Sequence, residues 1–375
     1  MVHLAPSCDI STMWLSQLSL FHFRNYTHHV ITSTSSPQVI TGPNGSGKTN
    51  ILEAISLLAG GRGLRRATLP HLQNYKSDQP WALNMRLWDG EEELKINIGV
   101  EGLEASKKTV KVNGTVTPVT HLAQWVHVVW LTPFMDQLFL ESPARRRAFM
   151  DRLILPFDYQ HASRLAKLEY ALRERNRLLR DAVQDTTWMA TLEDRIAQES
   201  VSIMASRQHF LQELNEAILQ MGSAFPQAQC KLAGPIAQLL LIKPALEVED
   251  EVRDLLAAGR ARDSVSGGGI SAQQSDLNVY HLDFGRPAEV CSTGEQKALL
   301  LSIVLAQARL IVAHTGRPPL ILLDEVVAHL DQARRYALFK EILALRMQGW
   351  LTGTDRGLFT ELEQDAHFFS VSLSQ

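Results

Sequence analysis

The chain has 375 residues, of which 45% are hydrophobic and 21% charged, and this composition is typical of a soluble globular protein with two or three domains. Its formal net charge of −3 excludes a uniformly basic nucleic-acid-binding protein, so any DNA site must be a local patch. The three cysteines, Cys8, Cys230 and Cys291, fit no disulfide or metal-ligand spacing, which favours a reducing cytoplasm.

The first residues predict a leader and then a strand. Residues 1–12 lack a signal-peptide pattern, and we expect them to form a flexible leader. Leu18, Leu20 and the phenylalanines at 21 and 23 indicate a largely buried strand, with its alternation shifted by one residue near Phe21.

The segment Gly42-Pro43-Asn44-Gly45-Ser46-Gly47-Lys48-Thr49 matches the phosphate-binding P-loop pattern, G-x-x-x-x-G-K-[ST]. Val39-Ile40 predicts a buried strand before the loop, and Ile51, Leu52, Ile55 and Leu58 predict a helix after it. The backbone N–H groups of such a loop surround phosphate oxygens. Lys48 would contact the β- and γ-phosphates of ATP, and Thr49 would bind Mg²⁺. A chance match is improbable because the strand and helix lie where the motif requires them.

The next segments predict a β meander and then a helical insert. Alternating runs at 83–88 and 94–100 flank an Asp-Gly turn, and a third run ends at Asn113-Gly114. Residues 126–131 predict a buried strand. From about Glu141, apolar stripes over 165–179 and 192–218 predict two long helices packed as an antiparallel pair. The Gly- and Ser-rich stretch 264–275 indicates a loop at the end of this insert. We expect no membrane span, because the most apolar stretch, 298–313, is short and contains Gln307 and Arg309.

An apolar run at 319–323 ends in Asp324 and Glu325. A buried strand that delivers Asp324 would complete a Mg²⁺ site with Thr49, and Glu325 could orient or deprotonate the attacking water. The alternative is an ordinary buried strand with an acidic turn. The P-loop upstream favours the functional interpretation.

The hexapeptide 292–297, Ser-Thr-Gly-Glu-Gln-Lys, begins 32 residues before Asp324 and precedes an apolar helix. It resembles the signature motif of ABC-type ATPases, although Ser292 or Thr293 could simply cap the helix. Residues 328–331 would be the D-loop. The resemblance implies a dimer that encloses ATP. One subunit would contribute Gly42 to Asn50, Asp324 and Glu325, and the other would contribute in trans Ser292, Thr293, Gly294, Glu295 and Asp331.

The distance between motifs separates classes of ABC-type ATPase. Lys48 and Ser292 are 244 residues apart, which is far more than in transporter subunits and less than in SMC proteins with their long coiled coils. This spacing and several local motifs resemble the RecF family of bacterial DNA replication and repair proteins. The resemblance runs from Trp14 nearly to the end of the chain. The motifs are Phe23-Arg24-Asn25-Tyr26, the P-loop continuing to Ile55, Gly61 to Arg65, Thr132-Pro133, Ser142-Pro143, the arginine triplet 145–147 with Asp151, the signature and Asp324-Glu325.

The chain departs from that family at two places. Ser271-Ala272-Gln273-Gln274 replaces a Gly-Pro-His-Arg-like motif. Thr354 stands where transporters place a histidine that senses the γ-phosphate.

Charge is uneven along the insert. Residues 141–180 contain ten Lys and Arg against five Asp and Glu, whereas residues 181–260 contain six against twelve. A solvated helix face is one explanation of the basic part, and contact with DNA phosphates is the other. No helix suited to reading a DNA groove is recognisable, so sequence-specific binding is not expected. The candidates for phosphate contacts are Arg62, Arg65, Arg66, Arg145, Arg146, Arg147, Arg173, Arg177 and Arg180.

The resemblance implies an α/β fold: an ABC-type P-loop ATPase head with an antiparallel β subdomain and an inserted all-helical arm. We expect residues 13–140 and 265–375 to form the split head and residues 141–264 to form the arm. It also implies a cytoplasmic, weakly DNA-stimulated ATPase with ATP and Mg²⁺ as cofactors. Such a protein would dimerise on ATP, bind single-stranded and duplex DNA at gaps, and act in recombinational repair, replication-fork maintenance and the SOS response. It would promote recombinase loading together with RecR-type and RecO-type mediators. Two alternatives remain open: an ATP-gated scaffold without significant hydrolysis, and a nucleotide-binding subunit of an ABC transporter.

Overall fold

The computed structural model describes residues 13–181, 185–222 and 224–372, so the expected leader, residues 1–12, lies outside the described residues. The chain divides into two compact units. The head unit comprises Met1–Asp136, Met221–Pro226 and Thr293–Gln375, and the arm unit comprises Gln137–Gln220 and Gln227–Ser292.

An antiparallel sheet forms one layer of the head unit, with strand order β2-β1-β4-β5-β6-β7. The meander from β4 to β7 confirms the expectation from alternating residues and turn signals. A β-bulge between Leu15 and Gln17 shifts the register of β1. The strands are β1 (Trp14–Phe23), β2 (Tyr26–Thr32), β4 (Ala82–Trp88), β5 (Glu93–Gly99), β6 (Thr109–Val112) and β7 (Thr115–Val116).

A parallel sheet forms the second layer, with strand order β14-β3-β13-β12-β8. Leu320 and Leu322 of β12 join the core that contains the apolar face of the antiparallel sheet. Ile321 and Leu323 alternate with them and are also fully buried, so both faces of β12 are covered. The strands are β3 (Gln38–Thr41), β8 (Val128–Leu131), β12 (Leu320–Leu323), β13 (Gly349–Gly353) and β14 (His367–Ser370).

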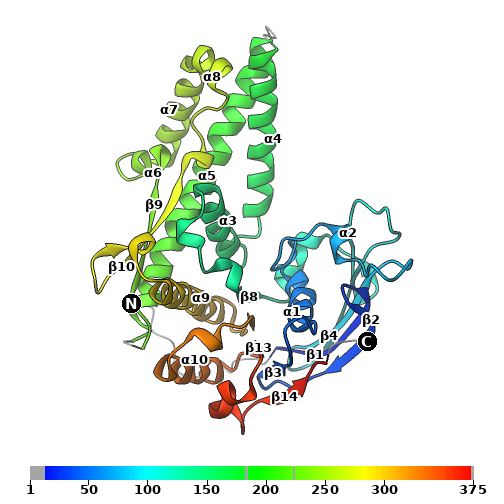
Figure 1. Ribbon diagram of the computed structural model, residues 1–375. Helices are drawn as coiled ribbons and strands as arrows, with labels where there is room; N and C mark the ends of the chain where they lie inside the picture. Colours follow the sequence, from blue (N-terminus) through cyan, green and yellow to red (C-terminus); the bar gives the residue numbers. More distant parts are fainter. Residues whose placement is uncertain (1–12, 182–184, 223, 373–375) are drawn as a thin grey trace. The chain divides into compact units, whose positions relative to one another are not determined.

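The helices of the head unit connect these strands (Figure 1). They are α1 (Lys48–Ser56), α2 (Leu69–Leu72), α9 (Thr293–Thr315) and α10 (Gln332–Ala344). Short 3₁₀ helices are η1 (Leu57–Ala59), η2 (Val119–Gln124), η3 (Pro133–Met135), η7 (Val327–His329) and η8 (Arg356–Leu362). Among the described residues, α9 alone is long and apolar enough to cross a membrane, and 78% of its apolar window is buried inside the protein.

Two long helices dominate the arm unit, α4 (His161–Arg180) and α5 (Thr186–Leu219). They lie side by side in opposite directions in Figure 1, as their apolar stripes predicted. The other elements are α3 (Pro143–Ile154), α6 (Pro235–Leu240), α7 (Ala245–Ala258), α8 (Arg260–Ser266), η4 (Leu138–Leu140), η5 (Ala272–Gln274), η6 (Ala288–Val290), and the strands β9 (Ala228–Ala233), β10 (Asp276–His281) and β11 (Arg286–Pro287).

The arm is not all-helical, so that expectation was wrong in one respect. Strand β9 lies within 141–264 and pairs with β10, over residues 276–281, in a three-stranded sheet with order β11-β10-β9. Its sequence, Ala-Gln-Cys-Lys-Leu-Ala, carries a weak strand signal, because small residues occupy its buried positions. The same pairing places residues 265–292 in the arm unit, whereas we had expected them in the head.

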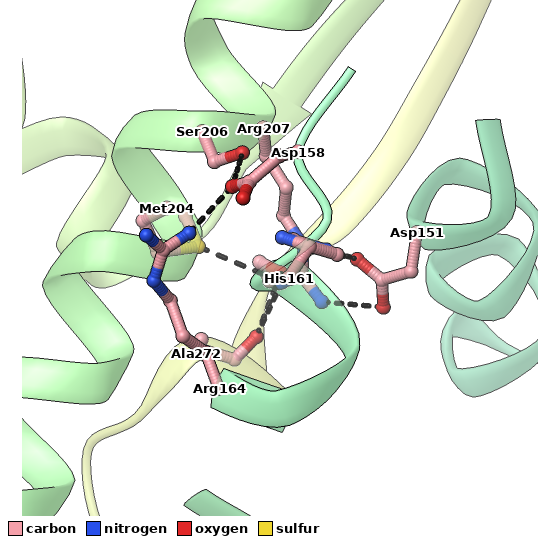
Figure 2. Close-up of polar contacts among 9 residues, drawn as sticks. Asp151, Asp158, His161, Arg164, Met204, Ser206, Arg207 and Ala272 are labelled. Carbon is pink, nitrogen blue, oxygen red and sulfur yellow. Dashed lines mark hydrogen bonds and ion pairs between the residues drawn. The ribbon is translucent and has the colours of Figure 1, made fainter. Parts of the chain in front are cut away.

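Buried ionic contacts join the helices of the arm unit (Figure 2). Arg207 of α5 is 2% exposed and donates from Nε and Nη2 to the two carboxylate oxygens of Asp151, both at 2.8 Å. His161 Nε2 lies 2.9 Å from Asp151 Oδ1. Burial raises the pKa of Asp151, but the hydrogen bonds from His161 and Arg207 outweigh burial and hold this pKa below its usual value. Arg207 Nη1 also donates to Ala272 O and Ser275 Oγ, which connects α5 to the loop before β10.

Candidate nucleotide-binding site

The P-loop joins β3 to α1, as the sequence predicts. Gly42 has φ +153° and Gly47 has φ +104°, and a Cβ at Gly42 would lie 2.2 Å from Val371 O. These two positions therefore require glycine. Lys48 is 4% exposed, and its ammonium donates to the carbonyl oxygens of Gly42 at 2.7 Å and Pro43 at 3.0 Å, so the charge lies inside the loop.

The turn between β1 and β2 supports the loop. Arg24 donates two hydrogen bonds, 2.8 and 2.7 Å long, to the fully buried carboxylate of Glu53 on α1. Asn25 donates to Ser46 O at 3.3 Å and accepts from Asn50 Nδ2 at 2.7 Å. Burial raises the pKa of Tyr26 to about 12, so its hydroxyl keeps its proton at neutral pH. These contacts hold the P-loop and the first turn of α1 in one conformation.

The acidic strand meets the P-loop as the sequence predicts. Thr49 Oγ1 donates to Asp324 Oδ1 at 2.9 Å, although the two residues are 275 positions apart in the chain. Asp324 is 4% exposed and follows β12, which lies two strands from β3 in the parallel sheet. Glu325 follows with φ +53°, an uncommon backbone conformation for a residue other than glycine. Thr352 on the intervening strand β13 contacts both acidic residues, and our reading of the sequence missed it.

These groups fit a magnesium nucleotide. A threonine hydroxyl and one carboxylate are hard oxygen donors, and Mg²⁺ commonly takes one or two such protein ligands together with phosphates and water. Among the described residues there is no cluster of three or more His, Cys, Asp or Glu that would form an all-protein metal site. The Ser46 hydroxyl is buried and has no hydrogen-bond partner within the described part of the chain. It is therefore a polar group that a phosphate oxygen could satisfy.

The signature and D-loop residues occupy the ends of helices. Helix α9 begins at Thr293, so Ser292 lies immediately before it, and both residues and Gly294 are exposed. Lys297 forms an ion pair of 2.9 Å with Asp136, within the head unit. Asp331 caps α10, because its side chain accepts from Arg334 N at 2.8 Å. This cap explains Asp331 structurally, and its role in trans stays a prediction.

The candidate DNA-binding arginines differ in their surroundings. Arg146 is 15% exposed and forms two hydrogen bonds with Asp276, and Arg147 donates to Ser275 O at 2.7 Å. Arg65 donates to Asn50 Oδ1 at 2.9 Å, beside the P-loop. These three side chains have partners within their own unit. The others are exposed: Arg62, Arg66, Arg145, Arg173, Arg177 and Arg180. Of these, Arg177 also forms a surface ion pair of 2.8 Å with Glu174.

The two sheets, the P-loop, the acidic strand and the signature helix define an ABC-type P-loop ATPase head carrying an inserted arm. The model of the RecF/RecN/SMC N terminal domain matches residues 14–372. The DNA replication and repair protein RecF of Mesorhizobium japonicum is 43% identical over 95% of this chain and 96% of its own length. RecF of Rhizobium rhizogenes is 40% identical over 96% of this chain and 97% of its own length. This chain belongs to the RecF family of DNA replication and repair proteins.

Solved structures share the fold. A structure of the recombination mediator protein RecF-ATPrS in the RecFOR pathway has a TM-score of 0.83 at 21% identity, covering 96% of each chain. The Smc head domain of Pyrococcus furiosus, with an extended coiled coil and bound to the C-terminal domain of ScpA, has a TM-score of 0.53 at 18% identity, covering 96% of this chain and 94% of that one. These likenesses confirm the predicted fold class of an ABC-type head, which RecF and SMC proteins share.

Proposed function

We propose that this chain is an ATP-switched DNA-binding protein of recombinational repair and replication-fork maintenance. The observation that carries the proposal is the hydrogen bond between Thr49 and Asp324. It joins the end of the P-loop to the end of β12 and so brings together the two halves of an ATP and Mg²⁺ site. We infer that the P-loop residues Gly42 to Asn50 bind the nucleotide. Lys48, whose ammonium contacts the carbonyl oxygens of Gly42 and Pro43, would turn from them to the phosphates.

Each residue of the site then has a defined task. Lys48 would leave the carbonyls of its own loop and contact the phosphate oxygens, and Thr49 and Asp324, which hydrogen bond to each other here, would hold Mg²⁺. Bound Mg²⁺ neutralises charge on the phosphates. Glu325 orients the attacking water and accepts its proton. A second copy of the chain supplies Ser292, Thr293, Gly294, Glu295 and Asp331, so ATP stabilises the dimer and hydrolysis releases it. ATP can shift the monomer–dimer equilibrium by no more than the difference between its binding free energies for the dimer and for the monomer.

DNA binding is proposed for the exposed cations. Arg173, Arg177 and Arg180 lie on one exposed face of α4. We place phosphate contacts there and at Arg62, Arg66 and Arg145. Arg65, Arg146 and Arg147 would first have to leave their present partners. The relatives' pathway suggests that the chain acts in the cytoplasm with RecO-type and RecR-type mediators, promotes recombinase loading on single strands and contributes to the SOS response.

The central experiment measures ATP turnover and dimer mass with gapped, duplex and single-stranded DNA, for the wild-type chain and Glu325→Gln. We expect slow turnover that DNA stimulates. Glu325→Gln should lower turnover and accumulate an ATP-bound dimer, because it removes the base and keeps the nucleotide contacts. ATP-dependent dimers without measurable turnover would instead favour the non-enzymatic scaffold. A variant that turns over ATP at the wild-type rate would refute the role of Glu325.

The DNA surface is tested by reversing the charges of Arg173, Arg177 and Arg180 to Glu. Affinity should fall, and the slope of log affinity against log salt should become shallower by about two to three units. The matched control reverses Arg195, Lys231 and Arg262, three exposed cations on other elements of the arm unit. Equal effects of the two triple variants would show that total charge matters and the α4 face does not.

A further inference from the structure

Thr352 lies between the two halves of the proposed ATP site. Strand β13 separates β3, which leads into the P-loop, from β12, which ends in the acidic pair. On one side of β13, Leu351 pairs with Leu323 of β12, so the residues that follow them, Thr352 and Asp324, also lie beside each other. On the other side, Thr352 pairs with Ile40 of β3. Thr352 is fully buried. Its position follows from the register of three parallel strands.

The Thr352 hydroxyl uses both of its hydrogen-bonding capacities on the acidic pair. It donates to Asp324 Oδ1 at 2.8 Å and accepts from the backbone N–H of Glu325 at 3.0 Å. Asp324 Oδ1 therefore accepts from two hydroxyls, Thr352 and Thr49. Two donors on one oxygen fix the rotation of the carboxylate. A valine at this position has nearly the same shape but can make neither hydrogen bond.

The second hydrogen bond bears on the conformation of Glu325. The left-handed backbone of this residue is strained relative to the right-handed one, because its Cβ lies close to the following carbonyl oxygen. The hydrogen bond from Glu325 N–H to the Thr352 hydroxyl holds this turn against β13. One hydroxyl thus couples the orientation of the Asp324 carboxylate to the direction in which the Glu325 side chain leaves the backbone.

We propose that Thr352 is a positioning residue that aligns the Mg²⁺ partner Asp324 and the general base Glu325 through a single hydroxyl. This inference rests on the proposed ATPase function. The Thr352 hydroxyl contacts Asp324 and Glu325, so its loss should act through these two residues. Removing outer-shell partners of metal ligands typically lowers metal affinity or activity by about 10- to 100-fold.

The test compares wild type, Thr352→Val and Thr352→Ser in two measurements. One is the Mg²⁺ dependence of ATP turnover, and the other is the Mg²⁺ dependence of equilibrium binding of a fluorescent ATP analogue, which should shift in the same direction. We expect Thr352→Val to need about tenfold more Mg²⁺ for half-maximal turnover and to lose about tenfold in kcat. Its KM for ATP at saturating Mg²⁺ should stay within about twofold, because the P-loop contacts are unchanged. Thr352→Ser keeps the hydroxyl and should restore the wild-type Mg²⁺ curve. Thr360→Val, which changes an exposed threonine of the same unit, should leave all three quantities unchanged.

The possible outcomes are distinct. If the wild-type chain shows no Mg²⁺-dependent turnover, the proposed ATPase function fails. If the wild type is active and Thr352→Val keeps its Mg²⁺ curve and kcat, the positioning role is wrong. The role is also wrong if Thr352→Ser is as impaired as Thr352→Val, because packing alone would then explain both. If Thr352→Val does not fold, Thr352→Ala is measured against Thr352→Ser in its place.

Discussion

Replacing Asp151 by Asn should strongly destabilise the arm unit. Both oxygens of this carboxylate accept from Arg207, each at 2.8 Å, and Arg207 is 2% exposed. The amide keeps the size of the side chain but removes its charge, which leaves a buried guanidinium without a counter-ion. Breaking a buried ion pair in this way costs about 3–5 kcal/mol. That is a large part of the roughly 5–15 kcal/mol that stabilises a typical domain.

The measurement is urea unfolding by circular dichroism, combined with hydrogen exchange of peptides from α5. Exchange assigns the loss to the arm unit, since α5 carries Arg207 and the head unit should keep its protection. Arg195→Met is the matched control, because Arg195 lies on the same helix and its side chain is 52% exposed, so solvent screens its pair with Glu199. Glu199 also keeps Lys167 as a second cation at 3.9 Å, so the loss should stay below about 1 kcal/mol. The double variant Asp151→Asn with Arg207→Met should cost less than the sum of the two single variants.

A loss below about 1 kcal/mol for Asp151→Asn would refute this reasoning. Such a small loss would mean that His161 or solvent stabilises the charge of the Arg207 guanidinium to the same degree as the Asp151 carboxylate. Strict additivity of the two single variants would also contradict it, because the pair would then have no coupling energy.

Two further predictions concern the head unit. Burial, with a smaller contribution from Arg317, lowers the pKa of His127 to about 4. Folding therefore favours the neutral imidazole. The free energy of unfolding should decrease as the pH falls from about 6.5 toward 4. Between pH 7.5 and 5.5, the unfolding free energy of His127→Gln, measured with urea, should therefore decrease by about 1 kcal/mol less than that of the wild type. Equal decreases in the two proteins would contradict the assignment. Gly47→Ala should weaken binding of a fluorescent ATP analogue at least about tenfold, since φ +104° strains any L-residue by about 1–3 kcal/mol. The new methyl group would also clash with the side chains of Asn25 and Tyr26. If Gly47→Ala bound the analogue with wild-type affinity, the loop would have to adapt without cost, and the prediction would be wrong.

The sequence alone determined the motifs and their local structure. The P-loop requires glycines at fixed positions between a strand and a helix, and the structure has β3 and α1 there. Alternating residues and two turn signals predicted the meander from β4 to β7, and apolar stripes predicted the pair α4 and α5. Each of these patterns depends only on residues close together in the chain, so it can be recognised from a single sequence.

Only the tertiary structure decided what depends on contacts between distant segments. It placed β9 beside β10 and so assigned residues 265–292 to the arm unit, because strand pairing across a long separation leaves no signal within either segment. It gave Arg146 an internal partner, although in sequence it looks like its exposed neighbour Arg145. It also brought Thr352 to Asp324. A threonine near the end of a strand is unremarkable in sequence, and its importance arises from the register of three parallel strands.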